Sequence, residues 1–469
     1  MRDGAQRVAG RLVSDVVLVL VSLLKRSGER ATLRLEGAAR KAIGVLAFAL
    51  LAVLLVAVNL RAYRGYFQSD DLNTIGWVGM GPKLAYLEAT VSPRFQPDNF
   101  RPVGHFFFRE AALYFGLDFW KYVAVIQALH LLNVWLIWLL ARRLGAQSLA
   151  AAGGAVLFAF HMALFDVFWK PMYVFDLLCA TFCLLSVLLY ARGRWVLSFA
   201  AFWLAYKSKE LAVMLPFVLA AYEIWFGKRR WKPLIPFFLA SLSFGLQGIL
   251  LNPNRDNDYT FRFTAAAVAR TFQFYSAKVF LWPYLFLLLP VGALAARNRR
   301  AWFGLVTMVL FFFPLMFLPG RLFSAYCYVP FLGLAIAFSG IAPTGKWIPA
   351  AAFLLAFAPL DAHVLATQRS VTLRQAIDTR YWLTSIVQFS RAHPFIDGAV
   401  FRGLPNGYSQ AGCEGALRYI YHNHYLPVLP ADDPQSPALL TRPGVAVLVW
   451  YDSARYLSID LTGAAQPRQ

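Results

Sequence analysis

The sequence predicts an all-α polytopic membrane protein that carries a small α/β domain at its C-terminus. Three observations predict this fold class. Of the 469 residues, 59% are hydrophobic and only 15% are charged, against about 25% charged residues in soluble domains. The apolar residues gather in long runs that are separated by basic loops. From about residue 367 these runs give way to short strand-like and helical segments. So much apolar surface requires lipid to cover it.

Eleven apolar runs are candidates for membrane spans. They cover residues 42–60, 119–141, 146–164, 173–191, 195–206, 211–227, 233–252, 279–296, 301–318, 322–342 and 347–366. The run at 195–206 makes roughly 18 Å of helix, against a hydrocarbon core of ~30 Å. We therefore expect the charged residues 207–210 to lie below the membrane surface, facing a wet cavity or a partner.

The basic residues predict the orientation of the chain. The net charge is +21, from 45 Lys and Arg against 24 Asp and Glu. Such an excess can mean nucleic acid, but these clusters fall between apolar runs, so no nucleic acid is expected. The five short inner loops hold 12 Lys and Arg in 20 residues, whereas the outer loops hold 14 in 98. This asymmetry predicts a cytoplasmic N-terminus in the plasma membrane, in bacteria the inner membrane, and an extracytoplasmic C-terminal domain.

The predicted organisation has three parts. Residues 1–41 form a cytoplasmic segment with an amphipathic helix. Residues 42–366 form the transmembrane domain, with a long first outer loop at 61–118. Residues 367–469 form the α/β domain, in which strands and a helix precede a hairpin that turns at "YDSA". The four cysteines do not form a disulfide framework, and Cys179 and Cys183 are expected to be small core residues.

The outer loops carry the residues that could do chemistry. The first loop holds two adjacent acids, Asp70 and Asp71, and a predicted amphipathic surface helix within 99–117. The candidates of the later part of that loop and of the other loops are Arg101, His105, Asp166, Lys207, Lys209, Glu210, Arg321, Tyr326 and Tyr328. Arg and Lys bind phosphate by charge-assisted hydrogen bonds, and a carboxylate can take a proton from a hydroxyl. This set suits a substrate with an anionic head and a lipid tail.

Some polar residues fall inside the predicted spans and favour structural roles. His130 and Asn133 lie one helical turn apart and are expected to hydrogen-bond a neighbouring helix. Asp176 begins a span, where an acid needs a partner. Lys209 and Glu210 could simply pair with each other. No zinc spacing, Walker loop, nucleophile elbow or dinucleotide fingerprint is present, so ATP-driven transport and nucleotide-sugar chemistry are unsupported.

An ordered set of segments on one side of the membrane resembles the GT-C superfamily of integral-membrane glycosyltransferases. The resemblance lies with the protein O-mannosyltransferase and aminoarabinose transferase branch and covers about residues 42–342. It is carried by the acid pair and then by "FRPV", "YVAVIQALHLLNVWLIWLLARRL", "FAFHMALFDVFW", "KSKELAVMLPFVL" and "RLFSAYCYVPFLGL". Relatives with a second acid usually carry Glu where this chain has Asp71. Residues 367–469 stand in place of the TPR repeats of one related branch.

The resemblance implies an inverting transfer of one sugar from a polyprenyl-phosphate donor to an acceptor hydroxyl on the outer face. The acceptor would be a glycan, a lipid or a protein, and membrane lipids would surround the enzyme. Asp70 would be the general base, and Asp71 would orient it or share a divalent metal with it. The donor phosphate would be held by Arg101, Lys209, Arg321 and Lys207. The cavity would also be lined by His105, Asp166, Glu210 and Tyr328.

Two alternatives stay open at this point. An O-antigen ligase or polymerase would use a lipid-diphosphate donor and a large late outer loop, whereas the largest outer loop here is the first. A lipid-linked sugar transporter or flippase often shows two similar halves, and this sequence has no such symmetry.

Overall fold

The computed structural model describes residues 44–68, 70–78, 82–94, 100–251, 258–341 and 347–462. It divides into two compact units, Met1–Val58 and Asn59–Gln469. In the first unit, a helix over Gly44–Val58 lies within the predicted first span. The amphipathic helix expected in residues 1–41 falls outside the described residues.

The second unit is mostly helical, as expected. Its helices before the C-terminal sheet are α2 (Asp71–Val78), α3 (Lys83–Val91), α4 (Pro102–Phe115), α5 (Phe119–Arg143), α6 (Ser148–Phe160), α7 (Phe165–Trp169), α8 (Val174–Ala191), α9 (Trp195–Ser208), α10 (Leu215–Trp225), α11 (Ile235–Leu250), α12 (Ala265–Val279), α13 (Leu288–Ala296), α14 (Arg299–Phe312), α15 (Pro330–Ile341) and α16 (Trp347–Ala392). Short 3₁₀ helices join them: η1 (Leu60–Arg64), η2 (Met162–Leu164), η3 (Pro171–Tyr173), η4 (Glu210–Met214), η5 (Lys232–Leu234), η6 (Leu285–Leu287), η7 (Phe313–Phe317) and η8 (Ser324–Cys327).

Several of these helices are long and apolar enough to cross a membrane. Five pass by length and composition within the described part of the chain, or six if the pair Ser148–Phe160 and Met162–Trp169, bent by 44°, is one span. Three shorter apolar helices accompany them: Gly44–Val58, Leu285–Ala296 and Pro330–Ile341. A polytopic helical fold is therefore confirmed, whereas the number of eleven spans stays a prediction.

Small residues allow the central helices of the bundle to approach closely. A Cβ on Gly304 of α14 would overlap the backbone of Ala337 in α15, and a Cβ on Gly333 of α15 would overlap Met308. Gly154 of α6 meets the carbonyl of Ala335 in the same way. Glycine at such positions brings helix backbones into van der Waals contact, which drives helix association in lipid, where burial of apolar side chains gives little advantage.

In its described part, the first outer loop contains the α-helices α2, α3 and α4 after η1. Helix α4 lies within the predicted amphipathic segment. Its Phe108 and Ala111 are buried, while Leu113 is 68% exposed and Tyr114 is 71% exposed. The exposed apolar side chains fit the expected helix at the membrane surface.

The C-terminal part is the expected α/β domain. Its elements are β1 (Gly398–Arg402), α17 (Gln410–Ile420), β2 (Val428–Pro430), α18 (Ser436–Leu440), β3 (Val445–Tyr451) and β4 (Tyr456–Leu461). The strand order is β2-β1-β3-β4. Strand β1 is parallel to both of its neighbours, and β3 and β4 form an antiparallel hairpin closed by the pair Tyr451 and Tyr456. The predicted hairpin at "YDSA" is thus confirmed.

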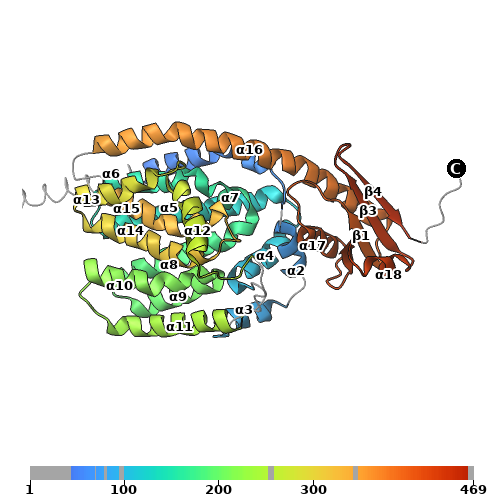
Figure 1. Cartoon of the computed structure of the whole chain (residues 1–469), viewed down its shortest axis with the longest axis horizontal. Coiled ribbons are helices and arrows are strands. Elements are labelled where there is room, and N and C mark those ends of the chain that lie inside the picture. The colour runs from blue at the N-terminus through green and yellow to red at the C-terminus, as the bar shows by residue number, and fades with distance from the viewer. Residues whose placement is uncertain are drawn as a thin grey trace, which may run out of the picture. The chain divides into compact units, whose positions relative to one another are not determined.

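Helix α16 joins the helical bundle to this domain. It runs unbroken from Trp347 to Ala392, so the expected boundary at 366/367 falls inside a helix, and the sheet starts only at Gly398. The helix contacts α6 and η2 near one end and α17 and β4 near the other. Figure 1 shows α16 running from the bundle to the sheet, with α17 beside α2.

Candidate active site

The two adjacent acids of the first outer loop have different surroundings. Asp71 is fully buried, and its two carboxylate oxygens accept hydrogen bonds from the backbone N–H groups of Gln68, at 2.8 Å, and Met172, at 2.7 Å. Asp70 is exposed, and its Oδ1 accepts a hydrogen bond from Ser409 Oγ at 2.9 Å. Asp71 therefore ties its loop to η3, while Asp70 presents a carboxylate outward.

This divergence follows from the local backbone. Helix α2 begins at Asp71, and the carbonyl of Asp70 accepts from the N–H of Thr74 at 3.1 Å, which makes the first helical turn. Consecutive side chains at a helix start point about 100° apart, so one acid faces the protein when the next faces away. Negative charge at this helix N-terminus is favourable.

The environment of Asp71 raises the pKa of its carboxyl group to near neutral pH. Burial raises its pKa to about 7, although the two backbone hydrogen bonds and nearby Lys170 act in the opposite direction. Removing a carboxylate from water disfavours its charged form. Asp71 can therefore change charge within the physiological range.

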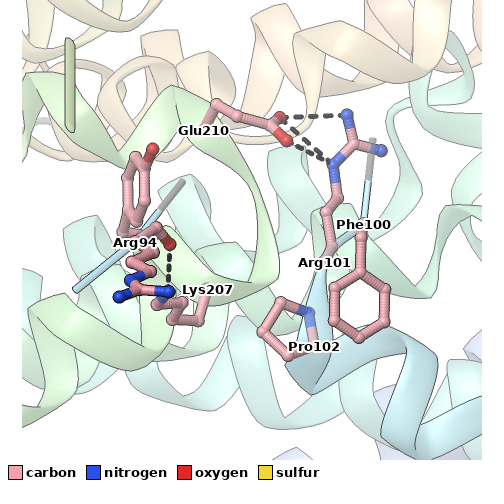
Figure 2. Close-up of a pocket in the computed structure, with 7 residues that line it drawn as sticks. Arg94, Phe100, Arg101, Pro102, Lys207 and Glu210 are labelled. Carbon is pink, nitrogen blue, oxygen red and sulfur yellow. Dashed lines mark hydrogen bonds and ion pairs between the residues drawn. The ribbon is translucent and has the colours of Figure 1, made fainter. Parts of the chain in front are cut away.

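Arg101 and Glu210 form a bidentate ion pair between distant parts of the chain. Arg101 Nε and Nη2 donate to the Glu210 carboxylate at 2.9 Å each. Figure 2 shows this pair together with Phe100 and Pro102 on one side of a small pocket. Because Arg101 already binds a carboxylate, its guanidinium has fewer N–H groups left for a phosphate.

Lys209 pairs with an acid of a neighbouring helix. Its Nζ lies 2.5 Å from Asp176 Oδ1, and both side chains are buried. The same ammonium lies 4.2 Å from the ring centroid of Tyr326. Lys209 and Glu210 thus take separate partners instead of pairing with each other, and Asp176 has the partner that a span acid needs.

Arg321 is surrounded by aromatic rings. Its Nη2 donates to Tyr326 Oη at 2.9 Å, and its guanidinium lies 4.2 Å from the ring centroid of Tyr259 and 4.7 Å from that of Phe323. Within the described ranges, Arg321 has no carboxylate partner. A guanidinium that aromatic faces hold in place keeps its full charge for an anionic ligand.

The charges of Arg321 and of Asp70 both act on Tyr259. Burial raises the pKa of Tyr259, Arg321 lowers it, and the charges of Arg101 and Asp70 also reach it. Tyr173 is likewise within electrostatic range of Asp71, Asp166, Asp176 and Tyr326. Charged residues from separate outer loops therefore share one electrostatic neighbourhood.

Lys207 lies on the other side of the short helix end from Lys209. It lines the pocket of Figure 2 with Arg94 and Tyr206, and its Nζ donates to the Arg94 carbonyl at 3.3 Å. The pocket volume of ≈ 20 Å³ has room for about one water. A phosphate would enter only if Arg94 or Lys207 moved. Lys207 thus has other partners than Lys209 and Arg321, which both contact Tyr326.

Two further predicted residues, His105 and Asp166, have mainly structural contacts. His105 is buried against Trp77, Phe100 and Phe175, and burial lowers its pKa to about 4, so its ring is neutral. Asp166 forms an ion pair with Lys170 at 2.8 Å.

Tyr328 is placed inside the helix bundle. It is fully buried, and its hydroxyl lies 2.8 Å from His130 Nδ1 and 3.2 Å from Asn133 Nδ2. Asn133 also donates to the carbonyl of Leu177 at 3.0 Å, which confirms the expected bond to another helix. Tyr326, two residues earlier, is the tyrosine that faces the cations.

Sequence reasoning missed several residues of this neighbourhood. They are Arg94, Tyr173, Tyr259 and Ser409, whereas Tyr326 is among the outer-loop candidates that the sequence indicates. Some of these residues could be found from the sequence. A tyrosine in an outer loop that also holds an arginine is a candidate site residue, because Arg packs on aromatic faces. Ser409 lies 339 residues after Asp70 in the sequence. No local sequence pattern could therefore predict that the two residues meet.

A divalent metal at the acid pair fits poorly with these contacts. Both oxygens of Asp71 already accept from backbone N–H groups, whose positive ends would face the cation. Within the described residues, no group of three or more His, Cys, Asp or Glu side chains could hold a metal ion. Asp70 alone would supply one carboxylate.

The described helical bundle, first outer loop and C-terminal domain share their overall fold with two solved structures. Comparison with solved structures finds ArnT from Cupriavidus metallidurans. The apo form is 15% identical over 89% of this chain and 99% of ArnT, with a TM-score of 0.52. The form bound to undecaprenyl phosphate is 14% identical over 90% and 99%, with a TM-score of 0.53. No family model and no curated protein matches the sequence. At these identities the likeness shows the fold alone.

Proposed function

We propose that the protein transfers a sugar from a polyprenyl-phosphate donor to an acceptor hydroxyl at the outer face of the membrane. The fold is that of ArnT, and one ArnT structure contains undecaprenyl phosphate. The observation that carries the proposal is made at Tyr259. The guanidinium of Arg321, which has no carboxylate partner in the described residues, lies 4.2 Å from the Tyr259 ring centroid, and the charge of the exposed Asp70 also acts on Tyr259.

In this proposal Asp70 is the general base. Its Oδ1 is held by Ser409, and its Oδ2 has no hydrogen-bond partner in the described part of the chain. The acceptor O–H would bond to Oδ2, lose its proton to the carboxylate and attack the anomeric carbon from the face opposite the phosphate. The bond from the anomeric carbon to the phosphate oxygen breaks, and the polyprenyl phosphate leaves with the electron pair.

The cations would stabilise that leaving group. Arg321 is the best placed, because it keeps its full charge and has free N–H groups. Arg321 and Lys209 both contact Tyr326. Lys209 would add positive charge near the phosphate, although Asp176 offsets part of that charge. Arg101, paired with Glu210, would position these loops more than bind the phosphate. Preorganised positive charge is what a phosphate leaving group requires.

The test is transfer by the purified, reconstituted protein. Labelled sugars on undecaprenyl monophosphate and on undecaprenyl diphosphate are supplied separately, with a cell-envelope extract as acceptor. We expect transfer from the monophosphate alone, and Asp70→Asn should lower it by at least ~100-fold.

The matched control is Asp118→Asn, which removes an acid of the same outer loop that pairs with Lys121 at 2.6 Å and should leave transfer intact. Transfer from the diphosphate alone would favour a ligase or polymerase. Movement of labelled donor across liposomes without acceptor would favour a transporter.

A further inference from the structure

Helix α17 of the C-terminal domain packs directly on α2, the helix that begins at the acid pair. At the crossing, a Cβ on Gly76 would overlap the carbonyl of Gly415, and a Cβ on Gly415 would overlap the carbonyl of Leu72. The two backbones are therefore in contact, which only glycine permits on both sides. Figure 1 shows α17 beside α2. Such a contact fixes the distance between the helices.

Ser409 joins the two helices at their N-terminal ends. Its Oγ donates to Asp70 Oδ1 at 2.9 Å and accepts from the N–H of Gly412 at 3.0 Å. The second bond is the N-cap of α17, so the position of the hydroxyl is set by the helix itself. A serine has a single O–H to donate, and here it is directed at the proposed catalytic carboxylate.

Further bonds hold the chain on either side of the acid pair. Tyr419 of α17 donates to the Ala112 carbonyl of α4 at 3.3 Å. From α16, the Thr372 carbonyl accepts from Gln68 Nε2 at 2.8 Å, and Arg380 Nη2 donates to the Gly65 carbonyl at 2.9 Å. The segment before α2 is thus fastened by elements that lie 300 residues later in the sequence.

We propose that Ser409 is a positioning residue for Asp70 and that α17 is an integral part of the active site's support. This inference rests on the proposed function. By occupying Oδ1, the Ser409 hydroxyl fixes the rotamer of the carboxylate and leaves Oδ2 as the oxygen that meets the acceptor. The C-terminal domain is then required for the chemistry itself, in addition to any role in binding an acceptor.

The first test separates positioning from stability in the full-length protein. Ser409→Ala removes the O–H donor, and we expect kcat for transfer to fall roughly tenfold or more, since hydrogen bonds to charged groups are among the stronger ones. The KM for the undecaprenyl-phosphate sugar should stay unchanged, because the Ser409 hydroxyl bonds Asp70 and Gly412 and, among the described residues, neither Arg321 nor Lys209. Ser409→Thr keeps the hydroxyl and should restore kcat.

The matched control is Ser458→Ala in β4, which removes a serine hydroxyl that also bonds an aspartate, Asp460, at 3.1 Å. It should leave kcat unchanged. Wild-type kcat in Ser409→Ala, or failure of Ser409→Thr to restore it, would overturn the inference.

A second measurement needs no enzyme assay and so keeps this inference distinct from the proposed function. Hydrogen exchange followed by mass spectrometry reports the opening of α2 over Asp71–Val78. Ser409→Ala and Gly415→Ala should both speed exchange there, whereas Ser458→Ala should not. Unchanged exchange in both variants would refute the coupling of α17 to α2. Faster exchange in a protein that transfers no sugar from any donor would refute the proposed function alone.

Discussion

At the scale of single residues, neighbours in sequence have different roles because the backbone turns between them. Asp70 and Asp71 are adjacent, yet one is exposed and bound to a serine while the other is buried and bound to two backbone amides. Lys207 and Lys209 diverge in the same way at the end of α9. The sequence alone would suggest that the two residues of each pair act together. In the structure, the two side chains of each pair have different contacts.

The buried acid gives a prediction about stability and pH. The folded-state pKa of Asp71, about 7, lies above the ordinary value of 3.8, so ionising Asp71 costs folding free energy. This cost is absent below about pH 4, grows up to about pH 7 and is then constant, and it amounts to ~4 kcal/mol at most. Asp71→Asn cannot titrate. We therefore expect the wild type to lose stability relative to this variant as the pH rises from 4 to 7.

The measurement is the difference in melting temperature between the two detergent-solubilised proteins from pH 4 to pH 8. Other titrating groups are common to both proteins and cancel in the difference. A difference that stays constant between pH 4 and pH 7 would show that Asp71 is ionised throughout, against the prediction.

Arg321 gives a prediction about lipid binding. Arg321→Ala removes a guanidinium that no described carboxylate neutralises, so undecaprenyl phosphate should bind at least ~10-fold more weakly. Native mass spectrometry or a thermal shift with added undecaprenyl phosphate measures this without a sugar or an acceptor. Arg391→Ala, which removes an exposed arginine at the end of α16, is the control. Equal binding by both variants would remove Arg321 from the phosphate site.

The sequence could predict which residue types meet at the site, but not their pairing. That Asp176 would need a partner followed from its place at the start of a span. The actual partners are Lys209 for Asp176 and Arg101 for Glu210. These pairings depend on the backbone between α9 and η4, which is extended at Lys209. The same holds for two tyrosines of one loop: Tyr326 contacts the cations, while Tyr328 bonds His130 and Asn133 inside the bundle.

At the scale of elements, the bundle depends on how closely α14 and α15 approach. Gly304→Ala places a methyl group on the backbone of Ala337, so the helices must separate. Overpacking of this kind costs ~1–3 kcal/mol, and we expect a lower melting temperature in detergent.

The control for this prediction is Gly153→Ala in α6. Its Cβ would meet the Phe338 ring at 3.4 Å, an ordinary contact. Equal melting temperatures for the two alanine variants would show that the crossing of α14 and α15 is looser than described.

Long apolar runs were the elements that the sequence predicted best, and the ends of elements the worst. The start of α5 at Phe119 matches its apolar run. Helix α16, by contrast, continues beyond its apolar run to Ala392, because a helix can leave the membrane without breaking when the polar residues that follow keep good helix propensity. The end of an apolar run indicates where a helix leaves the membrane. It does not indicate where the helix itself ends.

At the scale of the whole molecule, the proposed chemistry requires that the acid pair, the cations and the C-terminal domain lie on the same side of the membrane. The contacts of α17 with α2 place the domain and the acid pair together. Which side that is follows only from the basic inner loops, through the positive-inside rule.

Cysteine labelling tests this orientation directly. All four native cysteines are buried, so a membrane-impermeant maleimide should react little with the wild type in intact cells. Ser453→Cys in the C-terminal domain should be labelled from outside, while Arg194→Cys, in a predicted inner loop, should be labelled only after the cells are opened. Both side chains lie at accessible positions, so a difference between them reports the side of the membrane and not burial. The reverse pattern would place Asp70 and Ser409 in the cytoplasm, where a transferase acting on an outer-face donor could not use them.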